Sequence, residues 1–185
     1  KDIMLHQAGF VAWIPFYKET LYDGVHPDSV IYSRIKDAKH TVRVAENMYM
    51  WNSYVDTMFK RIRDSKLGPL HKYIYSDNDF ILMGKIVEQI TGMPLNEYVQ
   101  KTFYDPLGMK RTGFKPRSLV AVYRVAPTEN EQYFRLQQIH GDVHDPGAAM
   151  FGGVSGHAGL FSDTYDLAIL MQMLVNGGSM NSVQY

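Results

Sequence analysis

The chain has 185 residues and balances 19 Lys and Arg against 19 Asp and Glu, so its formal net charge is zero. With 45% hydrophobic and 21% charged residues it is typical of a globular domain, or part of one, and unlike a disordered chain. Zero charge without a Lys/Arg block argues against a nucleic-acid binder, and no apolar run approaches the ~18 residues of a membrane span. Because cysteine is absent, thiol nucleophiles, disulfides and Cys-ligated zinc are excluded.

The first two helices are expected in the middle of the chain. Ser53 begins a capping-box pattern, and an apolar period of a helix follows over 55–62 until Gly-Pro at 68–69. Asp77 or Asn78 can cap the next helix, which ends at Gly92. Apolar residues cover most of this second helix, so we expect it to be mostly buried.

Two further helices are expected after Gly92. The third begins at Pro94 and stops before Asp105-Pro106, because the residue before a proline disfavours helix. The fourth is capped by Ser162 and ends before Gly177-Gly178. Its residues expected to face inward are Leu167, Leu170, Met171 and Leu174.

Strand patterns are few. Val42 and Val44 alternate with polar neighbours, and the valines of segment 120–125 are compatible with an edge strand. The stretch from about Pro127 to Phe161 has no clear period and is rich in Gly, Ala and His. Loops of that length inside a compact domain are uncommon and usually functional.

The segment Tyr75-Ser76-Asp77-Asn78 is the first candidate for chemistry. It precedes the second helix, where unpaired backbone N–H groups make the local potential positive. That potential favours an anionic side chain, so Tyr75 could accept a proton if cations lie near. The alternative is structural, with Ser-Asp-Asn capping the helix and Tyr75 packing in the core.

The His-rich loop is the second candidate. His140, His144 and His157, with Asp142 and Asp145, carry donor atoms that zinc accepts. Their spacing fits no standard zinc signature, and the neighbouring glycines form no phosphate-binding loop. We therefore expect no metal and no cofactor, and a loop whose side chains bond to its own backbone.

A third pattern, Ser33-Arg34-Ile35-Lys36, matches the S-x-x-K sequence that places a lysine amine one helical turn from a nucleophilic serine. The motif is short and matches often by chance. The surrounding residues show no amphipathic helix, so we interpret this match as a coincidence.

Four segments carry a family resemblance. They are Leu5–Phe10, similar to LLxHxSGL; Tyr75–Gly92, similar to a Tyr-containing second motif and its helix; Pro106–Thr112, similar to PLGMxxT; and Gly152–Gly178, similar to GG…GLxST…DLA…NGG. In this order they resemble the serine beta-lactamase-like family, which includes class C beta-lactamases, DD-carboxypeptidases and related esterases. The loop at 140–161 is similar to that of envelope hydrolases with VHDxNA…GGVxGHAGLFS loops, some of them fused to glycoside hydrolase domains.

The resemblance implies roles for four residues. Tyr75 takes the position of the tyrosine that moves a proton together with the S-x-x-K lysine. Asp77 stands in the same catalytic motif where Asn is commoner, so the resemblance assigns both Tyr75 and Asp77 to the catalytic residues. His144 and His157 lie in the stretch that walls the substrate pocket. By family order, the nucleophile motif would precede Lys1 and the third motif would follow Tyr185, so we expect residues 1–185 to be the middle of a domain.

The resemblance also implies a fold and an activity. The fold expected is α+β and beta-lactamase/transpeptidase-like, with this chain forming mostly its helical part. The parent protein would be a serine hydrolase of the bacterial envelope or periplasm, transferring acyl groups from a peptide, lactam or ester substrate, and the isolated chain would be inactive. The remainder of the parent chain would be its partner. A non-catalytic binding module and a metal-dependent hydrolase using the His-rich loop stay open as alternatives.

Overall fold

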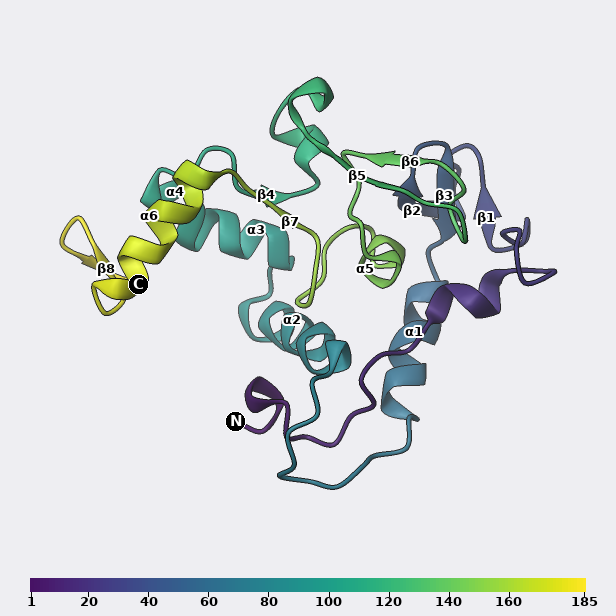
Figure 1. The fold of residues 1–185 in the computed structure, drawn as a ribbon, viewed down its shortest axis with the longest axis horizontal. Helices are drawn as coiled ribbons and strands as arrows, with labels where there is room; N and C mark the ends of the chain where they lie inside the picture. Colours follow the sequence, from purple (N-terminus) through teal and green to yellow (C-terminus); the bar gives the residue numbers. More distant parts are fainter.

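The computed structural model describes all residues, 1–185. The short strands and helices form two groups, one that contains β1, β2, β3, α1 and α5 and one that contains α4 and α6, and α2 lies between them (Figure 1). The helices are α1 (Tyr54–Arg63), α2 (Asp77–Thr91), α3 (Leu95–Val99), α4 (Asp105–Leu107), α5 (Pro146–Met150) and α6 (Thr164–Val175), with a π-helical turn at Gln100–Tyr104. Short 3-10 turns occur at Ile3–Leu5, Phe16–Thr20, Pro116–Ser118 and Val122–Arg124. None of the helices is long and apolar enough to span a membrane.

The strands form small antiparallel sheets. They are β1 (Tyr32–Ser33), β2 (His40–Ala45), β3 (Met48–Trp51), β4 (Gly113–Phe114), β5 (Pro127–Asn130), β6 (Gln138–His140), β7 (Leu160–Phe161), β8 (Ser179–Met180) and β9 (Val183–Gln184). The largest sheet has the order β1-β3-β2, and the other strands pair as β4-β7, β5-β6 and β8-β9. In β2 the predicted strand is confirmed, with Val42 opposite Met50 and Val44 buried.

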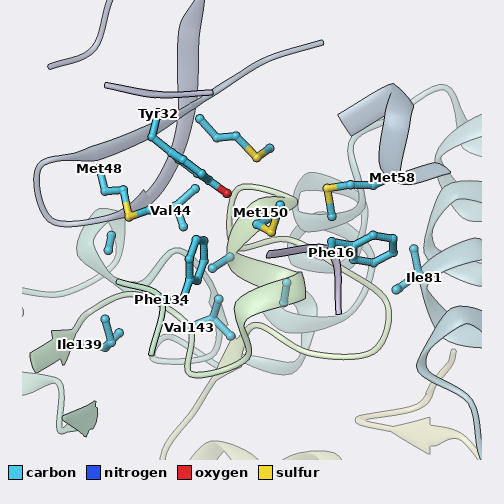
Figure 2. Packing of buried hydrophobic residues seen from close by; sticks show 14 of the residues in the cluster. Phe16, Tyr32, Val44, Met48, Met58, Ile81, Phe134, Ile139, Val143 and Met150 are labelled. Carbon is cyan, nitrogen blue, oxygen red and sulfur yellow. The ribbon is translucent and has the colours of Figure 1, made fainter. Parts of the chain in front are cut away.

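The main core lies between the three-stranded sheet, α1, α5 and the β5-β6 hairpin. Figure 2 shows Phe134 among Tyr32, Val44 and Met150, residues contributed by segments far apart in the sequence. Methionines supply much of this packing, which suits a core assembled from short elements because the thioether chain fills irregular gaps. A separate cluster of Tyr104, Leu107, Met109 and Met173 joins α4 to α6.

The four predicted helices exist, but their ends differ from expectation. Gly92 ends α2 with φ of 68°, as its position predicted. Ser53 makes no side-chain capping bond to α1, and α6 is capped by Asp163, which accepts a hydrogen bond from Asp166 N, rather than by Ser162. The third helix does not stop before Asp105-Pro106: it continues through the π-helical turn at Gln100–Tyr104 into α4, which contains the proline.

Two predictions of burial are confirmed only in part. In α2 the fully buried residues are Asn78, Asp79, Ile81 and Gly84, and Ile90 is 80% exposed. In α6 Leu170 is half-buried and packs against the cluster around Met173, as expected. The other residues expected to face inward, Leu167, Met171 and Leu174, are exposed, whereas Asp166 and Met173 are buried. The apolar faces of both helices are wider than the area that other elements of this chain cover.

The prediction for the second half of the chain was also partly wrong. Val122–Arg124 is a 3-10 turn rather than an edge strand. The stretch without a clear period contains the β5-β6 hairpin, α5 and β7. These elements are too short to impose a visible period, and they are held by buried side chains rather than by local propensity.

Candidate active site

The segment before α2 is fixed by the N-terminal segment of the chain, which runs beside it. Ser76 Oγ donates to Val11 O at 2.6 Å, and Asn78 Nδ2 donates to the same oxygen at 2.9 Å. The backbone N–H of Asp77 donates to Ala12 O at 2.8 Å. Ser76 and Asn78 therefore hold two segments together, and no side chain makes the capping bond to α2 that the sequence predicted.

Tyr75 is not a core residue. Its side chain is 59% exposed at the start of α2, and no protein group bonds to its hydroxyl. The ring lies against the imidazole of His6, with ring centroids 4.5 Å apart. Tyr75 therefore packs against His6 with its ring, while more than half of the residue is open to solvent.

The imidazole of His6, which packs against Tyr75, is paired with the buried carboxyl group of Asp79. Nδ1 of His6 lies 3.0 Å from Oδ2 of Asp79 and 3.1 Å from the backbone nitrogen of Ser76. Burial raises the pKa of Asp79, and the hydrogen bond and charge of His6 oppose that rise. Sequence reasoning missed this pair because its members are separated by 73 positions. The motif around His6 was the available signal.

Asp77 lines a cavity of about 200 Å³, which we call the Asp77 cavity. Asp145 and His157 line the same cavity. Burial raises the pKa of Asp77; the nearby His157 lowers it, and the charge of Asp145 raises it further. The sequence predictions for Asp77 and His157 thus converge on one place.

The buried His157 side chain lies between two side-chain partners. Its Nδ1 lies 2.8 Å from Ser155 Oγ, and its Nε2 lies 3.0 Å from Asp145 Oδ1. The same Asp145 oxygen accepts from Ala148 N at 2.6 Å and so caps α5. Although burial opposes it, the hydrogen bonds from His157 and Ala148 lower the pKa of Asp145. Both ring nitrogens of His157 are therefore occupied by the protein.

His144 lies elsewhere. Its side chain is 62% exposed, with Nδ1 3.2 Å from Glu129 Oε2, and it does not line the Asp77 cavity. His140 Nε2 lies 2.6 Å from Val125 O. The three histidines of the loop therefore face three different partners and do not converge on a common point. Of the two histidines assigned to substrate binding, His157 lines the Asp77 cavity and His144 does not.

The loop that walls the cavity is anchored by an ion pair between two fully buried side chains, Glu131 and Arg135. Arg135 Nε donates to Glu131 Oε2 at 2.6 Å, and its Nη1 and Nη2 donate to the carbonyls of Val143 and His144. Glu131 Oε1 accepts from three backbone N–H groups of residues 133–135. This clamp ties the β5-β6 hairpin to the chain that leads to Asp145.

The Ser33–Lys36 match does not form a catalytic pair. Ser33 ends β1, and its Oγ donates to Ile35 O at 2.8 Å within an exposed bend rather than a helix. Ser33 borders a separate cavity of about 630 Å³, which His26 and Arg34 also line. Tyr75 and Asp77 do not line it.

The model of the Beta-lactamase family matches residues 2–184. The chain belongs to this family. A putative D-alanyl-D-alanine carboxypeptidase of Salmonella typhimurium is 44% identical over 93% of this chain and 45% of its own length. A second, from Salmonella schwarzengrund, is 45% identical over 63% of this chain and 30% of its own length. The chain therefore spans less than half of the curated relatives that it matches.

Solved structures agree on the fold. D-amino acid amidase from Ochrobactrum anthropi has a TM-score of 0.53 at 18% identity, over 95% of this chain and 43% of that one. A penicillin-binding protein homologue from Pyrococcus abyssi has a TM-score of 0.56 at 18% identity, over 96% of this chain and 34% of that one. The expected α+β beta-lactamase/transpeptidase-like fold, present in part, is confirmed, and so is the family resemblance of the four motifs.

Proposed function

We propose that the whole protein is a serine hydrolase that transfers an acyl group from an amide or ester, and that this chain supplies its proton-transfer tyrosine, Tyr75. The observation that carries the proposal is the placement of Tyr75: it is exposed at the start of α2, and its ring packs against His6, which is paired with the buried Asp79. The similarity to putative D-alanyl-D-alanine carboxypeptidases supports peptide substrates related to peptidoglycan, or lactams.

In the proposed reaction, Tyr75 of this chain accepts a proton and later returns it. As the nucleophilic serine attacks the carbonyl carbon, its hydroxyl proton passes to the oxygen of deprotonated Tyr75, and the carbonyl electrons move to oxygen. When the tetrahedral intermediate collapses, the proton passes from Tyr75 to the departing amine or alkoxide. The serine and a lysine that would keep Tyr75 deprotonated are expected by resemblance outside residues 1–185. The contact of Tyr75 with His6 matters for this step, because the tyrosine oxygen must stay within hydrogen-bond distance of the serine oxygen and of the leaving group.

We propose that Asp77 acts in this site together with Tyr75, and that His157 and His144 contact the substrate. Asp77 and His157 line one cavity beside the tyrosine segment, which supports their assignment. His144 is assigned by resemblance alone. The proposed location is the bacterial cell envelope or periplasm, where peptidoglycan lies, and fractionation of cells expressing the whole protein tests it.

Covalent labelling tests the proposal. The whole protein is incubated with a fluorescent penicillin and with a fluorophosphonate, and intact mass is measured. We expect one label per chain on a serine outside residues 1–185, and none on the isolated chain. Ser33→Ala is the matched control and should label like wild type. Absence of label on the whole protein would favour a non-catalytic module, and label on Ser33 would refute the interpretation of Ser33–Lys36 as a coincidence.

A further inference from the structure

The imidazole of His6 is the centre of an aromatic cluster that includes Tyr75. The ring centroids of Tyr75, Phe80 and Tyr73 lie 4.5, 5.1 and 5.8 Å from that of His6, whose side chain is 11% exposed. The backbone of His6 is fixed as well, because its carbonyl oxygen accepts a hydrogen bond from Ile74 N at 2.9 Å. The orientation of the imidazole therefore determines the surface against which the ring of Tyr75 packs.

The nitrogen Nδ1 of His6 is a hydrogen-bond acceptor. The backbone N–H of Ser76 donates to it at 3.1 Å, and a ring nitrogen that accepts a hydrogen bond carries a lone pair and no hydrogen. Because a peptide N–H can only donate, this bond assigns the ring hydrogen to Nε2 and makes His6 neutral. In an imidazolium, or in the tautomer with its hydrogen on Nδ1, two N–H groups would face each other.

The carboxyl group of Asp79 contacts the same nitrogen. Its Oδ2 lies 3.0 Å from Nδ1 of His6, and since Nδ1 has no hydrogen to donate, this contact is a hydrogen bond only if Oδ2 carries the hydrogen. The Asp79 side chain is 1% exposed, and its Oδ1 has no hydrogen-bond partner. A carboxylate without donors is far more costly to bury than a neutral carboxylic acid.

The electrostatic surroundings of Asp79 act in the same direction. Burial raises the pKa of Asp79, and a neutral His6 has no charge to oppose that rise. The only basic side chain that pairs with Asp79 is His6 itself. Both members of the pair are therefore uncharged, and one hydrogen bond between them fixes the rotation of the imidazole.

We propose that Asp79 holds its proton at neutral pH and donates it in a hydrogen bond from Oδ2 to Nδ1 of His6, so that this pair positions Tyr75 for proton transfer. Asp79 and His6 are positioning residues, because they act through the ring of Tyr75. The inference rests on the proposed function in the role that it gives to Tyr75. It adds a protonation state that the sequence does not indicate, since an aspartate in the first turn of a helix is normally a stabilising anion.

Spectroscopy of the whole protein at neutral pH tests the protonation states without turnover. In ¹⁵N NMR of histidine-labelled protein, with the signal of His6 assigned through His6→Gln, we expect the neutral tautomer with its hydrogen on Nε2. In infrared spectra we expect the C=O stretch of a protonated carboxyl group that Asp79→Asn removes and Asp77→Asn retains. An imidazolium or an Nδ1–H tautomer at His6, or no loss of a carboxylic acid band in Asp79→Asn, would overturn the proposal.

Steady-state kinetics of two variants test the positioning role. Asparagine has the shape of a carboxylic acid and an N–H donor for His6 Nδ1, so Asp79→Asn should keep kcat close to wild type. Leucine has a similar size and no donor, so Asp79→Leu should lower kcat by up to about 10²-fold with KM little changed, as misplacement of a catalytic group does. Asp56→Asn makes the same charge change on the exposed start of α1 and should leave kcat unchanged. A loss in Asp79→Asn as large as that in Asp79→Leu, or no loss in either, would overturn the positioning role.

The spectra do not depend on Asp79→Leu, so they decide the proposal if that variant fails to fold. They also separate this inference from the proposed function. Full activity of Tyr75→Phe would refute the role of Tyr75, whereas an ionised Asp79 would refute this inference whatever the activity of the enzyme.

Discussion

Replacing Arg135 by methionine should destabilise the fold by about 3–5 kcal/mol, the range found when one partner of a buried ion pair is removed. Arg135 and Glu131 are both fully buried, and Arg135 makes charge-assisted bonds to Glu131 Oε2 at 2.6 Å and to Val143 O at 2.7 Å. The substitution preserves most of the side-chain volume. It leaves the Glu131 carboxylate buried without its countercharge and two carbonyl groups without a donor, so electrostatics rather than a cavity dominates the loss.

The measurement is urea unfolding of the whole protein followed by circular dichroism. Arg61→Met is the matched control, because Arg61 pairs with Glu19 on the surface, where both side chains are almost half exposed and such pairs contribute at most about 1 kcal/mol. A loss for Arg135→Met no greater than that for Arg61→Met would refute the role of the clamp. The β5-β6 hairpin would then have to be held in place by contacts other than this ion pair.

Further predictions concern packing, pH and metal. A Cβ atom at Gly156 would collide with the carbonyl group of Phe80 in α2, so Gly156→Ala should lower the free energy of unfolding in urea by about 1–3 kcal/mol. Gly68→Ala is the control, because a Cβ atom there meets only ordinary contacts and should lower the free energy of unfolding less. The backbone hydrogen bond from Asp166 N at the start of α6 lowers the pKa of Asp163 in the folded state. The charged carboxylate therefore stabilises the fold at pH values above its unfolded pKa of about 3.9. This stabilisation is lost as the pH falls through the lower pKa of the folded state. The stability difference between wild type and Asp163→Asn should therefore narrow below about pH 4, and a constant difference from pH 7 to pH 2 would contradict this assignment. Metal analysis of the purified whole protein should find no tightly held zinc in the 140–157 loop; one zinc per chain, lost together with stability on chelation, would revive the metal-dependent alternative.

Local sequence patterns predicted where the helices lie better than which of their faces are buried. The apolar period and Gly92 were sufficient to define α2, because both act within a few residues. The burial of its faces depends on which elements cover them, and Ile90 shows that helical spacing alone does not decide it. The same reasoning failed for Leu167 and Leu174 in α6, which the rest of this chain leaves exposed.

The candidate site also contains some residues that the sequence predicted and others that it did not. Tyr75 and Asp77 could be found from one short segment and its family resemblance. Their neighbours could not, because His6–Asp79 and Asp145–His157 join positions that only the fold brings together. Nothing in the local pattern around 127–161 indicates the β5-β6 hairpin, since the buried Glu131–Arg135 pair that anchors it resembles an ordinary surface pair in the sequence.

The central claim is that Tyr75 transfers a proton rather than supporting the fold, and Tyr75→Phe in the whole protein tests it most directly. Steady-state hydrolysis of a D-alanyl-D-alanine peptide and urea unfolding are measured on the same preparations. We predict that kcat falls by about 10²–10⁴, the range for loss of a general base, while KM and the unfolding midpoint stay close to wild type. An unchanged kcat, or a loss of activity matched by an equal loss of stability, would contradict the claim.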